Sequence, residues 1–332
     1  MNGFRGALIA GAALLVSAQS FADDSSAALG MGGLEFTRSN AVRMAREDLS
    51  ISPKDVRIRY EFANDGASDV TTLVAFPLPD IDLWEFYESP IGTIGEDPVN
   101  FVGFTATVDG KRVPVIVEQR AFLGNRDVTD IVRAAGAPVN ALVGDGIQKL
   151  DHLPADKKRI LENAGLAEAE APDQEHPKWI VRTKFYWSQT FPAHKTVTIE
   201  HAYHPVTGQT FFTEFDLKPT ADSGRNWQRD TCMDGPTVTT IRKMLDAQKG
   251  AQNGQLLNIY STDFILKTAN YWKAGIGTLH VTFDKLKPDN VLSLCWAGSL
   301  KKTGATTFES TLSDVYPASD IHMVVLESPT RQ

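Results

Sequence analysis

Short segments in which apolar and polar residues alternate constrain the fold of this chain more than any other feature. Residues 56–62 read Val-Arg-Ile-Arg-Tyr-Glu-Phe, and residues 179–187 repeat the pattern with two Trp, one Val and one Phe on one face. A period of two is typical of a strand with one buried side, because successive side chains point to opposite faces of a sheet. Asn64-Asp65-Gly66 and Asp109-Gly110 are turn signals between such strands. The pattern therefore predicts a mainly β fold with antiparallel strands.

We expect two antiparallel β-sandwich-like units with short helices inserted, because strand patterns recur on both sides of a weaker region near residue 208. The first unit spans residues 23–208 and includes a helical insertion at about 125–178; the second spans residues 209–332 and has one helix. A chain of 332 residues is long enough for two cores of moderate size. Further strands are predicted at 70–76, 102–108, 113–117, 197–203, 256–266, 278–283, 291–296 and 321–326.

Capping residues predict where the helices begin and end. Asp127 precedes apolar residues at helical spacing, and residues 154–165 form a second helical segment of the insertion. In the second unit, Asp234 is followed by proline and by an apolar stripe that ends at Gly250, which predicts a helix with an Asp cap. Residues 167–177 carry four acidic side chains without apolar periodicity, so we expect an exposed acidic loop there.

The first 22 residues have the pattern of a cleavable signal peptide. Arg5 precedes the short apolar run Ala7–Val16, and Ser20-Phe21-Ala22 supplies small residues at the two cleavage-site positions. The run is too short to span a bilayer, which needs about 20 residues. Cleavage after Ala22 would leave 310 of the 332 residues and, because Arg5 is lost, change the net charge from -8 to -9. We therefore expect export to the periplasm, with no membrane span in the mature chain.

The two cysteines fit an oxidising compartment. Cys232 and Cys295 are predicted to form a disulfide, which would close a loop of about 60 residues and be worth roughly 4 kcal/mol. The alternative is two unrelated buried thiols. A CxxC redox motif and a four-ligand zinc set are both absent from the sequence, and no cofactor is predicted. The acidic net charge argues against a nucleic-acid surface, which needs concentrated Lys and Arg.

Several motifs resemble a known family. Tyr60-Glu61-Phe62-Ala63-Asn64, residues 76–82 (Phe-Pro-Leu-Pro-Asp-Ile-Asp), the start of the mature chain at residues 23–36 and Thr190 to Gly208 are similar to exported bacterial proteins catalogued as domain of unknown function 4424. The resemblance covers most of the mature chain and implies an exported β-rich protein without an assigned activity. More distantly, the strand pair that ends in Phe-Pro-Leu-Pro is similar to the vault/inter-alpha-trypsin type of domain, which implies an interaction module.

An acidic and aromatic segment follows the second strand of the first hairpin. We interpret it as a loop that contacts a partner; the alternatives are a Ca²⁺ site and a solvated loop with core aromatics. Its candidate residues are Asp80, Asp82, Trp84, Glu85, Phe86 and Tyr87.

Two other motifs allow a metal hypothesis. Asp48-x-Ser50-x-Ser52 has the spacing of a metal-ion-dependent adhesion site, but it lacks the apolar parallel strand that should precede it and the helix that should follow. His201 and His204 are three residues apart on a predicted strand, so their imidazoles should point to opposite faces. Neither motif is expected to bind a metal.

The local sequence signatures of catalysis are missing. GxSxG and the phosphate-binding GxxxxGK[ST] do not occur. We therefore expect a non-catalytic exported protein that acts through protein contacts in the cell envelope, in an oligomeric state that the sequence leaves open. One alternative is a periplasmic protein that binds a small molecule in a pocket between the units, lined by Trp179, Trp187 and similar aromatics. The other alternative is a hydrolase whose Ser, His and Asp are dispersed along the chain.

Overall fold

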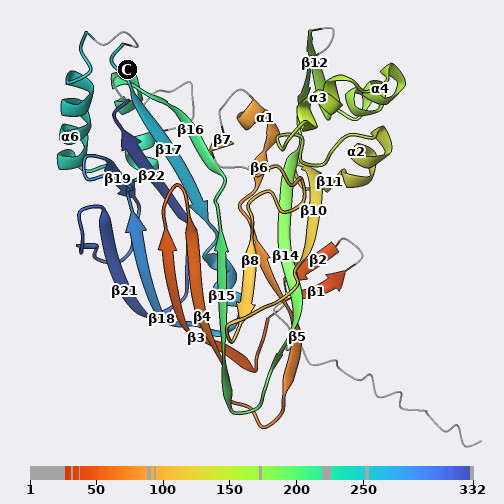
Figure 1. Cartoon of the computed structure of the whole chain (residues 1–332), viewed down its shortest axis with the longest axis vertical. Helices are drawn as coiled ribbons and strands as arrows, with labels where there is room; N and C mark the ends of the chain where they lie inside the picture. Colours follow the sequence, from red (N-terminus) through yellow and green to blue (C-terminus); the bar gives the residue numbers. More distant parts are fainter. Residues whose placement is uncertain are drawn as a thin grey trace, which may run out of the picture.

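The computed structural model describes residues 27–30, 33–36, 38–87, 91–92, 95–171, 174–218, 226–250 and 254–329. Within these residues the fold is mainly β, as predicted, with three large sheets and few short helices (Figure 1). The helices are α1 Leu83–Tyr87, α2 Thr129–Ala135, α3 Gly146–Asp151, α4 Ala155–Asn163, α5 Trp227–Asp230, α6 Gly235–Asp246, and the short 3₁₀ turns η1 Glu214–Leu217 and η2 Lys267–Tyr271.

The seven-stranded sheet has the order β11-β10-β14-β5-β1-β2, with β6 beside β14. Its strands are β1 Ala27–Gly30, β2 Gly33–Phe36, β5 Val70–Pro77, β6 Ile81–Asp82, β10 Ile116–Leu123, β11 Arg126–Asp127 and β14 Ile180–Phe191. The eight-stranded sheet has the order β20-β21-β18-β3-β4-β15-β8-β9. Its strands are β3 Val42–Ile51, β4 Val56–Asn64, β8 Thr105–Val108, β9 Lys111–Arg112, β15 Lys195–Tyr203, β18 Lys273–Asp284, β20 Lys301–Lys302 and β21 Thr307–Val315.

Aromatic side chains hold these two sheets together as a sandwich. Phe62 of β4 meets Phe191 of β14 with ring centroids 5.7 Å apart, and Phe76 of β5 meets His201 of β15 at 5.0 Å. Each of these four residues belongs to a strand that the alternation of the sequence predicts, and each side chain lies on the inner face of its sheet. Period two therefore identifies the core faces of the sandwich.

The five-stranded sheet is covered on both faces. Its order is β19-β22-β17-β16-β7, with β7 Ile91–Gly92, β16 Thr207–Phe212, β17 Leu257–Phe264, β19 Val291–Leu294 and β22 Ile321–Glu327. On β22, Met323 and Val325 join the main core, whereas Val324 and Leu326 pack in a second cluster with α6. The unbroken apolar run of this strand follows from that double coverage.

The eight-stranded sheet contains strands from both sides of residue 208. Within it β3 lies next to β18 in parallel, with Asp48 opposite His280. The two predicted units therefore share one sheet, and residue 208 falls within β16. The predicted helical insertion contains α2, α3 and α4, which lie together at one end of the molecule (Figure 1).

Residues 167–177 differ from the sequence expectation. They form a two-stranded hairpin, β12 Ala167–Ala171 and β13 Gln174–Pro177, where we expected an exposed loop. Main-chain pairing alone defines such a hairpin, so it needs no apolar period in the sequence. Glu168 forms an ion pair with Lys178 just beyond β13, which fastens the base of the hairpin.

The predicted disulfide joins Cys232 and Cys295 across 63 positions of sequence. The predicted helix cap is also present, because Asp234 Oδ1 accepts a hydrogen bond of 2.8 Å from the Thr237 amide at the start of α6. Among the described residues, no helix is both long and apolar enough to cross a membrane.

Candidate functional site

A pocket of about 240 Å³ opens where the segment from β5 to α1 meets the five-stranded sheet and α5. Three stretches far apart in sequence form its walls. They contribute Pro79, Asp80, Ile81, Glu85 and Phe86; Val206, Gly208, Gln209, Thr210, Trp227 and Asp230; and Ile259, Ser261, Asp263 and His322. Figure 1 shows the elements α1, β6, β16, β17 and β22, which carry most of these residues.

Part of the predicted acidic and aromatic loop belongs to this pocket. Asp80, Glu85 and Phe86 line it, whereas Asp82 instead caps α1, with Oδ1 accepting a hydrogen bond of 3.0 Å from the Trp84 amide. The Trp84 side chain is 48% exposed and lies against Lys178, whose Nζ is 5.0 Å from the ring centroid. The Tyr87 side chain lies outside the described part of the structure.

The carboxylates of the pocket have different partners. Asp80 pairs with Arg182 at 3.0 Å, and Asp263 accepts a hydrogen bond from His322 Nδ1. The two residues of this second pair lie directly opposite each other on β17 and β22. Glu85 has no ion pair with any residue that the structure describes, and its side chain is exposed.

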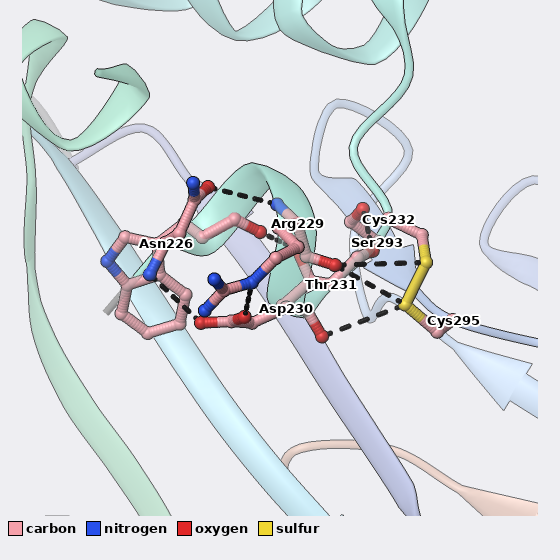
Figure 2. The surroundings of a disulfide bond; sticks show 8 residues. Asn226, Arg229, Asp230, Thr231, Cys232, Ser293 and Cys295 are labelled. Carbon is pink, nitrogen blue, oxygen red and sulfur yellow. Dashed lines mark hydrogen bonds and ion pairs between the residues drawn. A yellow bond between two sulfur atoms is a disulfide. The ribbon is translucent and has the colours of Figure 1, made fainter. Parts of the chain in front are cut away.

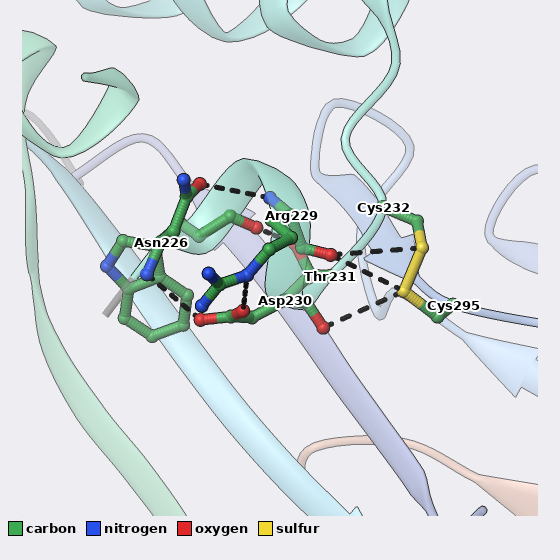
Figure 3. A network of polar contacts seen from close by, with 7 residues as sticks. Asn226, Arg229, Asp230, Thr231, Cys232 and Cys295 are labelled. Atoms are coloured by element: carbon green, nitrogen blue, oxygen red, sulfur yellow. Dashed lines mark hydrogen bonds and ion pairs between the residues drawn. A yellow bond between two sulfur atoms is a disulfide. The ribbon is translucent and has the colours of Figure 1, made fainter. Parts of the chain in front are cut away.

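Asp230 lies at the end of α5, in a turn that is fixed from several sides (Figures 2 and 3). Arg229 Nε donates to its Oδ1 at 2.8 Å, and the Asn226 amide donates to its Oδ2 at 2.9 Å. These hydrogen bonds, that of Arg229 first, hold the pKa of Asp230 below its ordinary value. The Asn226 side chain in turn accepts from the Arg229 amide and caps the turn.

The disulfide ties this turn to the segment after β19. Cys295 Sγ lies 3.7 Å from the Asp230 carbonyl oxygen, a van der Waals contact because a disulfide sulfur carries no proton. Next to it, Ser293 Oγ donates to the Thr231 carbonyl at 2.8 Å in a buried position (Figure 2). The disulfide therefore holds α5, which carries Asp230, against the end of the five-stranded sheet.

Two aromatic rings complete the pocket, and they differ from those expected. Phe86 and Trp227 line it, whereas Trp179 and Trp187 are 0% and 4% exposed and lie in the main core. Phe86 packs over β16 at Gly208, where a Cβ would come within 3.3 Å of Phe86 Cε1. A glycine at this position lets the ring lie flat against the strand.

Sequence reasoning missed Trp227, Asp230, Asp263 and His322. Asp263 and His322 are single polar residues in strands that were predicted, but which strands pair is not visible in one sequence. Asn226 and Asp230 have the spacing of a helix cap, which is the only local signal for the turn.

A carboxyl and an imidazole, those of Glu47 and His201, lie in the core, away from the pocket. Glu47 is 1% exposed and His201 is 5% exposed, and both line an internal cavity of about 40 Å³. Among the described residues, neither ring nitrogen of His201 has a hydrogen-bond partner. The ring is surrounded by those of Tyr60, Phe76, Phe104 and Trp187, at 5.0–5.5 Å between centroids. Burial raises the pKa of Glu47 to about 8 and lowers that of His201 to about 3.

The metal motifs of the sequence do not assemble. His201 points into the core, whereas His204 is exposed and its Nδ1 lies 2.9 Å from the Lys54 carbonyl oxygen. Asp48 and Ser50 lie within β3, where Asp48 accepts hydrogen bonds from Arg46. In the part of the chain that the structure describes, no three His, Cys, Asp or Glu side chains are grouped to hold a metal ion.

A broader groove of about 400 Å³ lies on the outer face of the eight-stranded sheet. Asp48, one of the lining residues, is already paired with Arg46, Arg59 and His280. The described lining of this groove contains no Phe, Tyr or Trp. The smaller pocket beside α5 combines charge, aromatic rings and enclosure, so we regard it as the candidate site.

Comparisons with known proteins give a family but no activity. No curated protein matches the chain. A crystal structure from Legionella pneumophila subsp. pneumophila str. Philadelphia 1, provisionally described as a nutrient binding protein, is similar with a TM-score of 0.42 and 16% identity over 86% of this chain and 67% of that chain. A family described as "Domain of unknown function (DUF4424)" matches residues 22–324. Because this match covers far more than half of the 332 residues, the chain belongs to the DUF4424 family.

Proposed function

We propose that the protein is exported and that the pocket beside α5 binds a small solute. The observation that carries this proposal is the pocket itself, whose 240 Å³ are enclosed by three stretches far apart in sequence and lined by two aromatic rings and four carboxylates. Ligand sites are concave, partly apolar and supplied with a few placed polar groups. At about 30 Å³ per water molecule in the liquid, the volume equals that of about eight water molecules, which suits a small solute.

The walls are rigid enough to bind without rearrangement. The turn that carries Asp230 is capped by Asn226 and tied by the disulfide, and Asp263 is hydrogen-bonded to His322 across two paired strands. A pocket whose side chains are already fixed loses less conformational entropy when a ligand binds.

Export is supported by three features together. The first 22 residues have the pattern of a signal peptide, the two cysteines are joined, and the described residues include no helix that could span a membrane. Fractionation of cells that express the protein, with N-terminal sequencing of the mature chain, tests this part. Sequencing should begin at Asp23; a chain that still begins at Met1 in the cytoplasm would contradict export.

A ligand screen tests the binding function. We expect members of a library of small solutes to raise the midpoint of thermal unfolding, since a ligand that binds only the folded state stabilises it. Ser261→Phe should fill the pocket and abolish these shifts, whereas the matched variant Ser313→Phe, at an exposed position of β21, should retain them. Shifts that persist in Ser261→Phe would mean that the solutes bind elsewhere.

Contact with an envelope protein is a second candidate function. Phe211 and Phe215 are 65% and 75% exposed, and both lie in the segment from β16 to η1. Exposed aromatic side chains are more frequent at protein interfaces than on other surfaces. Crosslinking in envelope extract should capture a partner that the Phe211→Ser, Phe215→Ser double variant loses. If only the monomer is recovered, from the natural protein as well as from the double variant, the result would contradict this function.

A hydrolase with a dispersed site is the third candidate. Ser261, His322 and Asp263 line the same pocket, and Asp263 accepts from His322 Nδ1, as in an acyl-transfer triad. Ser261 has no side-chain hydrogen bond to His322 in the described structure, and it lies in a strand paired on both edges, with Gly208 and Val324 opposite it. Covalent labelling by a fluorophosphonate that is lost in Ser261→Ala would support catalysis; an unlabelled protein would exclude this serine as the nucleophile.

A further inference from the structure

We propose that the solute bound in this pocket is an organic cation, an amine or quaternary ammonium compound, whose positive charge lies between the carboxylates and the rings of Phe86 and Trp227. This inference rests on the proposed function and specifies its ligand class.

The charges that line the pocket favour a cation. Four carboxylates face it, and two of them, Asp80 and Asp230, are paired with the guanidinium groups of Arg182 and Arg229. Two negative charges of the described lining therefore remain uncompensated when His322 is neutral. They belong to Glu85 of α1 and Asp263 of β17.

The contact between His322 and Asp263 places a side chain that can carry a positive charge against a carboxylate of the pocket. When protonated, the imidazolium of His322 lies against Asp263, to which Nδ1 donates. His322 also influences Asp230, whose pKa it helps to lower. The strands that flank this pair add no charge, because β19 contains only Val, Leu and Ser and the pocket residues of β16 are Gly, Gln and Thr. The pocket therefore already contains one titratable cation in contact with a carboxylate.

The aromatic rings add a second kind of attraction for the same class of ligand. A cation within about 6 Å of a ring centroid is attracted by the negative face of the ring, and desolvation in a pocket strengthens the attraction. Phe86 and Trp227 line the pocket from different elements, one from α1 and one from α5. A neutral ligand would gain apolar contact with these rings but would leave Glu85 and Asp263 unpaired.

Competition with His322 makes the binding dependent on pH. A bound cation and a protonated His322 would both be attracted to Asp263, so protonation of the imidazole disfavours the ligand. An ordinary imidazole titrates near pH 6.5. If binding and protonation exclude each other, the affinity for a permanent cation falls as the imidazole becomes protonated.

Matched probes test the ligand class with the purified full-length protein. Choline is compared with its neutral carbon isostere 3,3-dimethylbutan-1-ol, and 1,5-diaminopentane with pentane-1,5-diol, by NMR titration at pH 8 in low salt, where charge interactions are least screened. We expect the two cations to bind at least tenfold more tightly than their neutral partners. Equal binding of a cation and its neutral partner would overturn the cation inference and leave the pocket function intact. If neutral solutes of the library bind but neither cation does, the cation inference is likewise overturned and the pocket function stands. If the protein binds none of these compounds, the pocket function itself is contradicted.

Two variants tie the result to the pocket. Glu85→Gln should weaken the cations by about threefold or more without affecting the neutral probes, and Glu162→Gln on the exposed side of α4 is the matched control. His322→Asn can still donate to Asp263 but cannot titrate, so it should bind choline equally at pH 8 and pH 5.5. A loss of choline affinity from pH 8 to pH 5.5 that persists in His322→Asn would assign the titration to another group and refute the competition.

Discussion

Replacing Glu47 with glutamine is expected to stabilise the protein at pH 8 and to change its stability much less at pH 4.5. Glu47 is 1% exposed, lies opposite Tyr60 in the neighbouring strand and has no ion pair among the described residues. Burial, with a smaller contribution from Asp48, raises the pKa of this carboxyl from 4.5 to about 8. In the folded protein the group therefore stays protonated through a pH range in which it is ionised in the unfolded chain.

The size of the effect follows from linkage. Because the folded pKa is the higher one, the stabilising contribution is complete below pH 4.5 and is lost as the pH rises to about 8. Each pH unit in this window corresponds to about 1.4 kcal/mol, so the loss reaches about 5 kcal/mol at pH 8. Glutamine has nearly the same shape and no charge, so it removes this dependence. Its own buried amide adds a constant cost that does not vary with pH.

His201 has the opposite dependence. Its pKa is lowered by burial from 6.5 to about 3, so its contribution is complete above pH 6.5 and is lost as the pH falls towards 3. Between pH 4.5 and 6.5 the slopes of Glu47 and His201 are equal and of opposite sign. Together they give a plateau of stability in that interval, with a decline on either side.

Urea unfolding followed by tryptophan fluorescence at pH 4.5, 6, 7 and 8 measures the difference between Glu47→Gln and the natural protein. That difference should grow by several kcal/mol from pH 4.5 to pH 8, and the exposed control Glu162→Gln should give a constant value. A Glu47→Gln difference that is the same at pH 4.5 and pH 8 would refute the reasoning, since the carboxyl would then be ionised in the folded protein.

Four further changes test other parts of the structure. Cys232→Ser with Cys295→Ser should lower the free energy of unfolding by about 4 kcal/mol, measured in urea, because the open loop of 63 residues regains its entropy. Asp234→Ala removes the cap of α6 and should cost about 1 kcal/mol in the same assay, with Asp234→Asn nearly neutral. Phe104→Ala should cost about 3–5 kcal/mol, because this 1% exposed ring stacks on another at 4.3 Å and would leave a cavity. Gly208→Val should displace Phe86 and weaken ligand binding with less effect on stability; unchanged affinity would show that this ring does not contact the ligand.

The alternation of apolar and polar residues predicts where the strands of the sandwich lie, but it does not predict which strands pair with each other. Val56–Asn64 and Ile180–Phe191 are strands with the expected buried faces. Val42–Ile51 was not predicted, since Arg46 and Asp48 interrupt its apolar side chains, yet it is the central strand that joins the two halves of the eight-stranded sheet. Its stability comes from two neighbouring strands, and such long-range pairing leaves no local pattern in the sequence.

The sequence marks only one side of the candidate site, and it marks it as a partner-contact loop. Of the six residues predicted for that loop, Asp80, Glu85 and Phe86 line the pocket. The opposite wall depends on α5, a helix of four residues, and on the cross-strand pair of Asp263 with His322. A turn this short and a pair 59 positions apart are determined by tertiary contacts. Sequence periodicity cannot reveal them.

The disulfide connects the chemistry of the site with the compartment in which it forms. Trp227 and Asp230 belong to a helix of only four residues, and a helix this short is not stable through its own hydrogen bonds. Its position depends on the Asn226 cap, on the buried bond between Ser293 and Thr231, and on the disulfide beside them. The disulfide forms only where thiols are oxidised. A reduced chain would keep the sandwich, because neither of its two sheets contains a cysteine. It would, however, lose one support of the pocket wall that carries Trp227 and Asp230. Solute binding should therefore be more sensitive to reduction than the fold is, and the pocket should be complete only after the chain has reached an oxidising compartment.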